Sequence, residues 1–388
     1  QEAVALHQNN ELIEASERYQ KILSIMPDSP LVNYNHGLAL FELGRFEESY
    51  SCYSEALKQA PLDHDLLYNF ALCAKKLGKF VEAVDAYATI LEQQPDDKDS
   101  LYNLACCLMD SGADAKAIPL FLKVLDIDFN HPAALNNLAC TYHRNGDYDH
   151  AKKYYTRLLQ IQPSHKIARH LLASLQGDST QNAPDQYIEQ IFDNYSLRYE
   201  KNMVEDLEYT VPLKLRKAFD QAYNSSKHSL NTLDLGCGTG LAGEAFFNIC
   251  SSLVGVDLSS NMIDQAFKKN IYTSLYVEEI LKYLDSCDNV FDLIIAADVL
   301  IYFGDLQPIL AKLWKIAQPG TDLCFSSEKS TRNNFLLRRS GRFAHGIDYI
   351  KEVCAKTGWD IKLAEPAKLR KERFEWIEGM IYIASRTS

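Results

Sequence analysis

A glycine-rich segment, Asp234-Leu-Gly-Cys-Gly-Thr-Gly240, holds the residues best suited to bind a ligand. An apolar run over residues 230–235 leads directly into it. A second apolar run, 252–257, ends in Asp257, which lies 21 residues beyond Gly236. This is the span expected between a tight nucleotide-binding turn and a carboxylate that accepts hydrogen bonds from two ribose hydroxyls. The two runs therefore predict a site for a nucleoside cofactor.

Two nucleoside cofactors, S-adenosylmethionine and NAD, fit a turn of this kind, and two details of the sequence distinguish between them. The spacing is G-x-G-x-G, with Leu241 where the dinucleotide pattern G-x-G-x-x-G requires glycine. Asp234 stands two residues before the first glycine. A carboxylate there would repel a pyrophosphate, but it can accept hydrogen bonds from the ammonium group of a methionine moiety. The segment favours S-adenosylmethionine over NAD.

The elements that position this segment alternate short apolar runs with amphipathic helical patterns from Leu230 onward. This alternation predicts βαβ units, a mostly parallel sheet and a Rossmann-like α/β domain. The third strand is expected at 273–277, the fourth at 291–297 and the fifth at 321–327.

The first half of the chain repeats with a period of 34 residues. Pro27, Pro61, Pro95 and Pro163 are separated by 34 residues or a multiple of it, and Phe129 fills the one remaining slot. A small residue recurs in the same register at Gly37, Ala71, Ala105 and Ala139. The period and landmarks resemble those of tetratricopeptide repeats, which implies an all-α solenoid of stacked helix pairs, with a last helix at about 166–176 as its cap.

Asparagine occupies one position of every complete repeat: Asn35, Asn69, Asn103 and Asn137. The resemblance places this position on the inner groove of the solenoid. A side-chain amide both donates and accepts, so such a ladder suits a peptide backbone of any sequence. We expect a protein or peptide partner in the groove, although asparagine is also common at this position for structural reasons alone.

Composition limits the other classes of function. The net charge is -12, which makes nucleic acid a poor first expectation as partner. Ten cysteines without a CxxC pair indicate reduced core residues of a cytoplasmic protein, and no metal site is expected. No apolar run reaches the ~18 to 20 residues that span a bilayer. The chain starts without Met inside a partial repeat, so we expect a longer native N-terminus.

The two halves predict two domains, 1–177 for the repeats and 185–388 for the α/β domain. The polar segment 178–184 between them lacks large apolar residues and is predicted to be a linker.

Residues from about 190 to 385 resemble class I S-adenosylmethionine-dependent methyltransferases. The whole chain is similar to the predicted tetratricopeptide-containing methyltransferases through Phe192-Asp-Asn-Tyr195, Ala296-Ala-Asp-Val-Leu-Ile-Tyr302-Phe-Gly304 and Ser340-Gly-Arg-Phe-Ala-His345. The resemblance implies that the methionine part of the cofactor is surrounded by Asp234, Gly236, Cys237 and Gly238. It further implies that Asp257 holds the ribose, that Leu258 lies beside the adenine and that Glu279 lies near the adenine amino group.

Three further residues receive roles from the resemblance. Tyr195, on a helix before the first strand, is expected to reach the methionine carboxylate, together with Tyr199, although an apolar stripe of that helix is the alternative. Asp298 follows the fourth strand beside the expected methyl group, where it touches substrate or orients a loop. His345 is the candidate general base if the acceptor must lose a proton. Arg338, Arg339 and Arg342 form a basic cluster that meets an acidic substrate or is simply solvated.

The expected function is methyl transfer from S-adenosylmethionine, with the repeats recruiting a protein that is the substrate or its carrier. One alternative is a methyltransferase for a small molecule or a carrier-bound acyl group, in which the repeats serve assembly only. Another is a cofactor-binding scaffold without turnover. A pocket that no longer serves catalysis would be expected to lose some of its cofactor-binding residues. The presence of Asp234, Gly236, Gly238 and Asp257 therefore argues against the scaffold.

Overall fold

The computed structural model describes residues 1–195, 207–223, 226–372 and 375–387, except for the side chains of residues 190 and 192–195. The chain forms two compact units that divide between Ala168 and Arg169. This division lies before the predicted domain limits at residues 177 and 185. Helix α11 (Lys166–Gln176), predicted to cap the repeats, thus belongs mostly to the second unit, where the His170 ring donates a buried hydrogen bond to the carbonyl of Gly341 at 2.8 Å.

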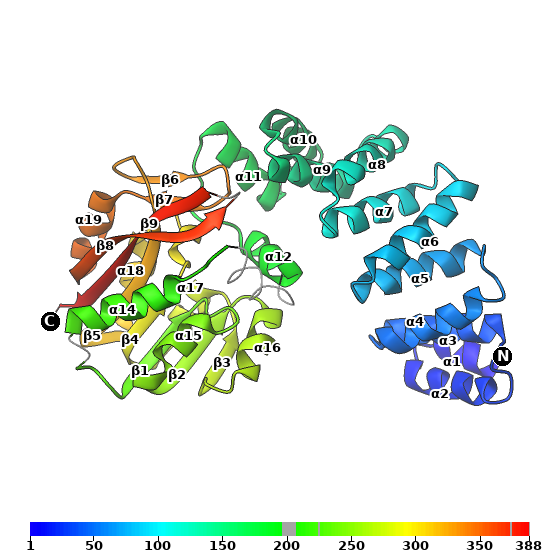
Figure 1. The fold of residues 1–388 in the computed structure, drawn as a ribbon, viewed down its shortest axis with the longest axis horizontal. Helices are drawn as coiled ribbons and strands as arrows, with labels where there is room; N and C mark the ends of the chain where they lie inside the picture. Colours follow the sequence, from blue (N-terminus) through cyan, green and yellow to red (C-terminus); the bar gives the residue numbers. More distant parts are fainter. Residues whose placement is uncertain (196–206, 224–225, 373–374, 388) are drawn as a thin grey trace. The chain divides into compact units, whose positions relative to one another are not determined.

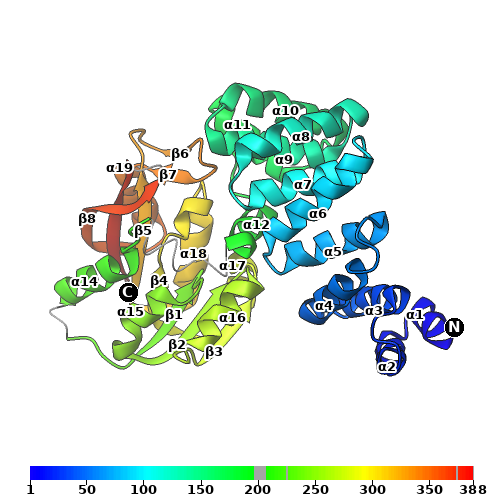
Figure 2. The same ribbon diagram turned by 45° about the vertical axis from the view of Figure 1, so that its right-hand side comes forward.

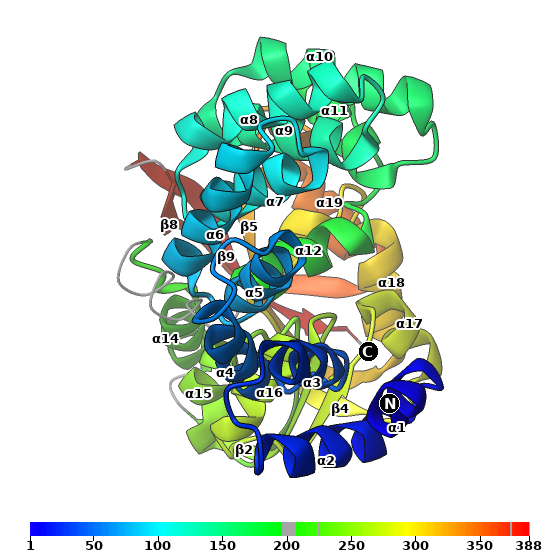
Figure 3. The same ribbon diagram turned by 90° about the vertical axis from the view of Figure 1, so that its right-hand side faces the viewer.

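Helices in antiparallel pairs make up the first unit (Figure 3). Their bounds are α1 (Glu2–Gln8), α2 (Leu12–Leu23), α3 (Pro30–Glu42), α4 (Phe46–Leu57), α5 (His64–Lys76), α6 (Phe80–Gln93), α7 (Lys98–Asp110), α8 (Asp114–Ile127), α9 (Pro132–Asn145) and α10 (Tyr148–Ile161).

Local sequence explains where these helices begin and end. The side chains of Asp63 and Asp97 cap α5 and α7 by accepting hydrogen bonds from backbone N–H groups three residues on, both at 2.9 Å. Four glycines 34 residues apart follow the first helix of each pair in the left-handed conformation, with φ from +71° to +82°: Gly44, Gly78, Gly112 and Gly146. The repeat is therefore set by turn chemistry as well as by its apolar register.

The predicted small residue sits where the two helices of a pair touch. A Cβ atom on Gly37 would lie 2.6 Å from the ring of Tyr53, so only glycine fits there. Ala71, Ala105 and Ala139 at the equivalent position are fully buried. This close approach confirms the stacked-helix architecture expected from the period.

Strands of one sheet organise the second unit (Figure 2). Their bounds are β1 (Leu230–Leu235), β2 (Cys250–Asp257), β3 (Ser274–Val277), β4 (Phe291–Ala296), β5 (Ala317–Lys329), β6 (Phe335–Leu337), β7 (Phe343–His345), β8 (Trp359–Glu372) and β9 (Glu375–Arg386). The helices of this unit are α12 (Asp185–Tyr195), α14 (Val211–Tyr223), α15 (Leu241–Phe246), α16 (Ser260–Lys268), α17 (Ile280–Ser286), α18 (Gln307–Lys315) and α19 (Ile347–Lys356), with the short η2 (Phe247–Ile249) and η3 (Leu300–Tyr302).

Strands β3, β2, β1, β4 and β5 are parallel neighbours in that order. Strand β9 pairs antiparallel with β5, and β8 pairs antiparallel with β9. The small β6–β7 hairpin joins the carboxyl end of β5. The strand order reverses between β1 and β4, and ligands of open α/β sheets bind beyond the carboxyl ends of the strands at such a point. The predicted mostly parallel α/β domain is confirmed.

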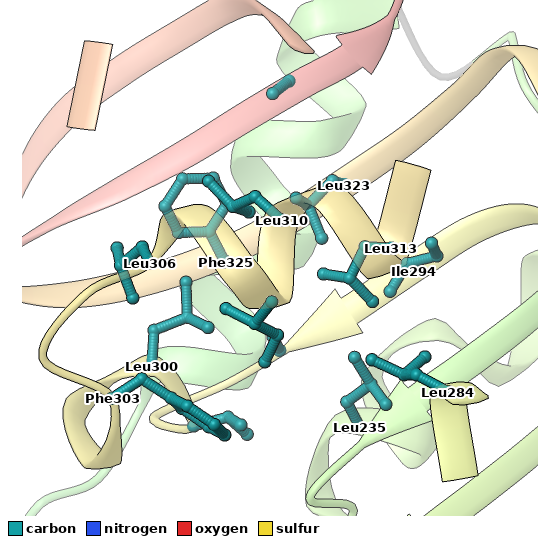
Figure 4. Close-up of a cluster of buried hydrophobic side chains, with 14 of the residues drawn as sticks. Leu235, Leu284, Ile294, Leu300, Phe303, Leu306, Leu310, Leu313, Leu323 and Phe325 are labelled. Atoms are coloured by element: carbon teal, nitrogen blue, oxygen red, sulfur yellow. The ribbon is translucent and has the colours of Figure 1, made fainter. Parts of the chain in front are cut away.

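Alternate residues of β4 face the two sides of the sheet. Leu293 and Ile295 pack in a core with α14 and α15, which cross one face (Figure 1). Ile294 and Ala296 pack on the other face, where Leu310 and Leu313 of α18 meet the sheet (Figure 4). This period of two is the pattern of a strand covered on both faces. Within the described residues, no helix is long and apolar enough to cross a membrane.

Candidate cofactor site

The glycine-rich segment forms the turn between β1 and α15. Gly236, Gly238 and Gly240 all have positive φ, at +59°, +54° and +92°. A Cβ atom on Gly236 would lie 2.7 Å from the Val299 side chain, whereas one on Gly238 would meet nothing within 4 Å. The backbone at Gly238 is therefore open to close approach by a ligand.

Asp257 ties this turn to the end of β2. Its Oδ2 accepts a hydrogen bond from the Gly238 N–H at 2.9 Å, and its Oδ1 accepts one from the Ser259 N–H at 2.9 Å. These bonds fix the carboxylate beside the turn, where the sequence predicts the ribose of the cofactor. The structure thus brings Asp257 and the turn together, as the spacing predicts.

Asp234 is fully buried at the end of β1. Its Oδ2 accepts a hydrogen bond from the Tyr272 hydroxyl at 2.7 Å, while its Oδ1 has no partner among the described residues. Burial raises the pKa of the Asp234 carboxyl from 3.8 to about 7, although the Tyr272 hydroxyl and the Gly243 amide oppose the shift. Sequence reasoning missed Tyr272, because it lies outside the glycine motif, in the loop before β3.

Other residues predicted to contact the cofactor have local roles that the sequence did not reveal. Burial raises the pKa of the Cys237 thiol well above its usual value, which favours the protonated thiol over a thiolate nucleophile. Leu258 is half-buried beside Asp257. Glu279 caps α17, where its carboxylate accepts hydrogen bonds from the N–H groups of Leu281 and Lys282 at 2.9 and 2.8 Å. The adenine contact of Glu279 stays a prediction, with a structural role now beside it.

Asp298 is held from both sides after β4. Its Oδ1 accepts a hydrogen bond from the Ser326 hydroxyl at 3.0 Å, and its Oδ2 accepts one from Arg370 Nη1 at 2.7 Å. Its own N–H donates to the Ser326 oxygen at 2.9 Å. Its backbone is left-handed, with φ of +57°. These bonds favour the loop-orienting role of Asp298 over direct contact with substrate.

The guanidinium of Arg370 is the centre of a buried ionic network. It pairs with Asp298, with Glu328 of β5 and with Glu372, the last at 3.0 Å. Arg338 and Arg342 pair in turn with Glu328 and Glu372. The network comprises three cations and three anions: Arg338, Arg342, Arg370, Asp298, Glu328 and Glu372.

Two members of the predicted basic cluster are therefore already neutralised. Arg338 and Arg342 bind acidic side chains of their own domain, so they do not form a free patch for an acidic substrate. Arg339 is exposed. The sequence could not show this, because the acidic partners come from β5 and β8, 10 to 30 residues away.

His345 does not have the surroundings of a general base. It is fully buried in β7, and its Nε2–H group lies 2.9 Å from the carbonyl oxygen of Phe303 and 3.1 Å from that of Gly304. Burial lowers its pKa to about 4. Burial and these contacts favour a structural role, in which the ring ties a loop to a strand, and the catalytic role of His345 stays a prediction.

Tyr195 ends helix α12, but its side chain lies outside the described residues, as does the whole of Tyr199. Their expected contact with a methionine carboxylate stays a prediction.

The asparagines of the first unit connect successive repeats. The Nδ2 atoms of Asn69, Asn103 and Asn137 donate to the hydroxyls of Tyr34, Tyr68 and Tyr102, at 3.1, 2.9 and 3.1 Å. Asn35, Asn69 and Asn103 also donate to the carbonyl four residues earlier. The amide donors are therefore engaged within the protein, and the predicted contacts of these asparagines with a peptide stay a prediction.

Comparisons with known proteins agree with these two architectures. Residues 233–325 match the family model described as "Methyltransferase domain". Residues 34–97, 74–139 and 132–165 match models described as "Tetratricopeptide repeat".

Curated relatives match parts of the chain. An uncharacterized methyltransferase of Schizosaccharomyces pombe is 29% identical over 104 residues, which cover 24% of this chain and 37% of that protein. Phosphoethanolamine N-methyltransferase 1 of Arabidopsis thaliana is 28% identical, over 44% of this chain and 36% of that protein. The chain thus spans little more than a third of the length of these two relatives.

Among solved structures, N-methyltransferase NodS of Bradyrhizobium japonicum, in complex with S-adenosyl-L-homocysteine, matches with a TM-score of 0.42 and 19% identity. The match covers 52% of this chain and 98% of that one.

The second unit has the sheet order and glycine-rich turn of a nucleoside-binding α/β domain. The chain combines tetratricopeptide repeats with a methyltransferase domain, which confirms the resemblance found in its sequence.

Proposed function

We propose that the second unit binds S-adenosylmethionine and transfers its methyl group to an acceptor. The observation that carries this proposal is the buried Oδ1 of Asp234, a carboxylate oxygen without a partner among the described residues. A buried carboxylate is stable only with a cation or a donor. The ammonium group of the methionine moiety supplies both, whereas the pyrophosphate of NAD would be repelled.

The residues present fit this cofactor in three places. Asp234 would accept from the ammonium group, and the open backbone at Gly238 would let the methionine part approach. Asp257, already fixed by two backbone amides, would accept from the ribose hydroxyls. When bound, the cofactor supplies a methyl group on a positively charged sulfur. The protein then contributes alignment and exclusion of water.

The surroundings of the two predicted catalytic residues favour an acceptor that reacts in its unprotonated form. His345 is neutral and buried, and both carboxylate oxygens of Asp298 are engaged. Neither side chain is poised to take a proton, so the acceptor proton would leave to water. Acceptors of this kind include amines, and carboxylates that are already ionised.

For the first unit we propose a partner that is an extended peptide, either the substrate or its carrier. The Nδ2 atoms of Asn35, Asn69 and Asn103 donate within the protein, but no hydrogen bond reaches their Oδ1 atoms among the described residues. These half-buried oxygens would accept from backbone N–H groups of a peptide. Assembly without substrate recruitment, and a scaffold without turnover, remain the alternatives.

A methyl-transfer screen tests the proposal. The protein is incubated with S-adenosylmethionine labelled in its methyl group and with separate protein and small-molecule fractions, and Asp257→Ala serves as the control. Label that enters one fraction with the wild type alone supports the enzyme. Label in the protein fraction favours recruitment by the repeats, and label in small molecules only favours assembly. Binding of the cofactor without transfer to any fraction would favour the scaffold.

A further inference from the structure

Tyr272 lies in the loop between α16 and β3, and it reaches 38 residues back in the sequence to Asp234. Its hydroxyl donates to Asp234 Oδ2 at 2.7 Å, although only part of the Tyr272 side chain is buried. Burial and the neighbouring Asp234 carboxylate both raise the pKa of the Tyr272 hydroxyl. The phenol therefore keeps its proton and remains a hydrogen-bond donor.

Three glycines of α15 and β2 leave the space that the Tyr272 ring fills. A Cβ atom on Gly240, at the start of α15, would lie 3.1 Å from the ring, and one on Gly255 of β2 would lie 2.9 Å from it. A Cβ atom on Gly243 of α15 would lie 2.7 Å from Cζ and closer still to the hydroxyl. The absence of side chains at all three positions places the hydroxyl at the Asp234 carboxylate.

The Tyr272 bond determines which oxygen of Asp234 is available. Oδ2 is engaged, and Oδ1 is buried without a partner among the described residues. The ionisable groups that act on this carboxylate or respond to it are Tyr272, Asp257, Cys237 and Cys250. None of the four is a cation, so among the described residues no cation accounts for the pKa of Asp234, and the ammonium group of a ligand would supply one.

We propose that Tyr272 is a positioning residue that holds the Asp234 carboxylate with Oδ1 open to the ammonium group of the cofactor's methionine moiety. The inference rests on the proposed cofactor, and it assigns to Tyr272 a contribution to affinity for the amino-acid end of the ligand only.

The test compares two ligands that share the adenosine part. S-adenosylhomocysteine carries the ammonium group, whereas 5′-methylthioadenosine lacks the amino-acid end. Binding of each is measured by calorimetry with the wild type, Tyr272→Phe and the control Tyr276→Phe. Tyr276 belongs to β3 and is exposed, and its ring packs near Tyr283, so the control removes a hydroxyl of the same kind away from Asp234.

Tyr272→Phe is expected to weaken binding of S-adenosylhomocysteine on the order of tenfold, the usual effect of losing a hydrogen bond to a charged group. Binding of 5′-methylthioadenosine is expected to stay within about twofold of the wild type, since it makes no use of the ammonium contact. Tyr276→Phe should leave both affinities unchanged. An equal loss for both ligands, or no loss for either, would overturn the inference. A wild type that binds neither ligand would instead contradict the proposed cofactor.

The pH dependence of binding distinguishes this role from a purely structural one, because a Tyr272 that only stabilised its loop would not change the pH at which affinity rises. Affinity of the wild type for S-adenosylhomocysteine is expected to rise with pH around 7, as Asp234 ionises. In Tyr272→Phe the midpoint should move to higher pH, because the lost hydrogen bond favoured the ionised carboxylate. An unmoved midpoint would count against the inference.

A second variant guards against misfolding of the first. Asp234→Asn should show the same preference between the two ligands, and adding Tyr272→Phe to it should cost little more affinity, because the two residues act as one unit. Fully additive losses would show that Tyr272 acts elsewhere.

Discussion

Replacing Asp234 with Asn should stabilise the second unit at neutral and alkaline pH while weakening cofactor binding. The folded protein raises the pKa of this carboxyl from 3.8 to about 7, mainly through burial. A carboxyl with a raised pKa favours the folded state while it is protonated, so its contribution is fully present below about pH 4 and is lost as pH rises through 7. Above pH 7 the wild type therefore carries the cost of a buried charge.

The size of this effect follows from the shift. A pKa raised from 3.8 to about 7 corresponds to on the order of 4 kcal/mol at alkaline pH. An amide removes the charge but leaves N–H groups unpaired near the former Oδ1, which costs roughly 1 to 2 kcal/mol. Asp234→Asn should thus be more stable than the wild type by about 2 to 3 kcal/mol at pH 8, and about as stable as the wild type at pH 5.

Urea unfolding followed by tryptophan fluorescence measures this difference. All three tryptophans, Trp314, Trp359 and Trp376, lie in the second unit, so their signal reports on that unit. Asp288→Asn, which changes an exposed carboxyl, is the matched control and should parallel the wild type. If Asp234→Asn follows the pH dependence of the wild type between pH 5 and 8, the account of a destabilised buried carboxylate is refuted.

Three further predictions concern other parts of the molecule. Arg370→Met leaves the acids around it unpaired and should lower the free energy of unfolding by about 3 to 5 kcal/mol, measured by the same fluorescence assay. A loss under 1 kcal/mol would show that the network is not a buried unit. Burial alone would raise the pKa of Glu372, but its arginine partners lower it below 4.5. The stability from this pairing should therefore be present above pH 4.5 and should fade as the pH falls further. Glu372→Gln should reduce this acid dependence of the free energy of unfolding. Asn103→Ala removes the bond to Tyr68 and should lower the stability of the first unit by about 1 kcal/mol by circular dichroism, without changing affinity for S-adenosylhomocysteine; a changed affinity would contradict the separation of the two roles.

The sequence predicted the fold well where one signal repeats or one motif has a fixed geometry. The 34-residue period gave the helix pairs, because each repeat must bury the same face against its neighbours. The turn from Gly236 to Gly240 and the carboxylate of Asp257 were found because both belong to one βαβ unit. Glycines such as Gly78 could have been recognised too, since they recur in the same register.

Contacts between distant segments explain what the sequence did not show. Tyr272 reaches Asp234 only because three glycines leave room for its ring. Arg370 neutralises Asp298 across 72 residues, and no local pattern marks that pairing. The chemistry of the His345 side chain suggested a base, whereas its burial favours a structural role. Residue type indicates what a side chain is able to do, and its partners determine what it does.

The most direct test of the central claim is a calorimetric titration of the whole chain with S-adenosylmethionine and, separately, with NAD. We expect micromolar binding of S-adenosylmethionine and no heat with NAD, because Asp234 offers a carboxylate to an ammonium group and repels a pyrophosphate. Binding of NAD, or silence with both ligands, would contradict it.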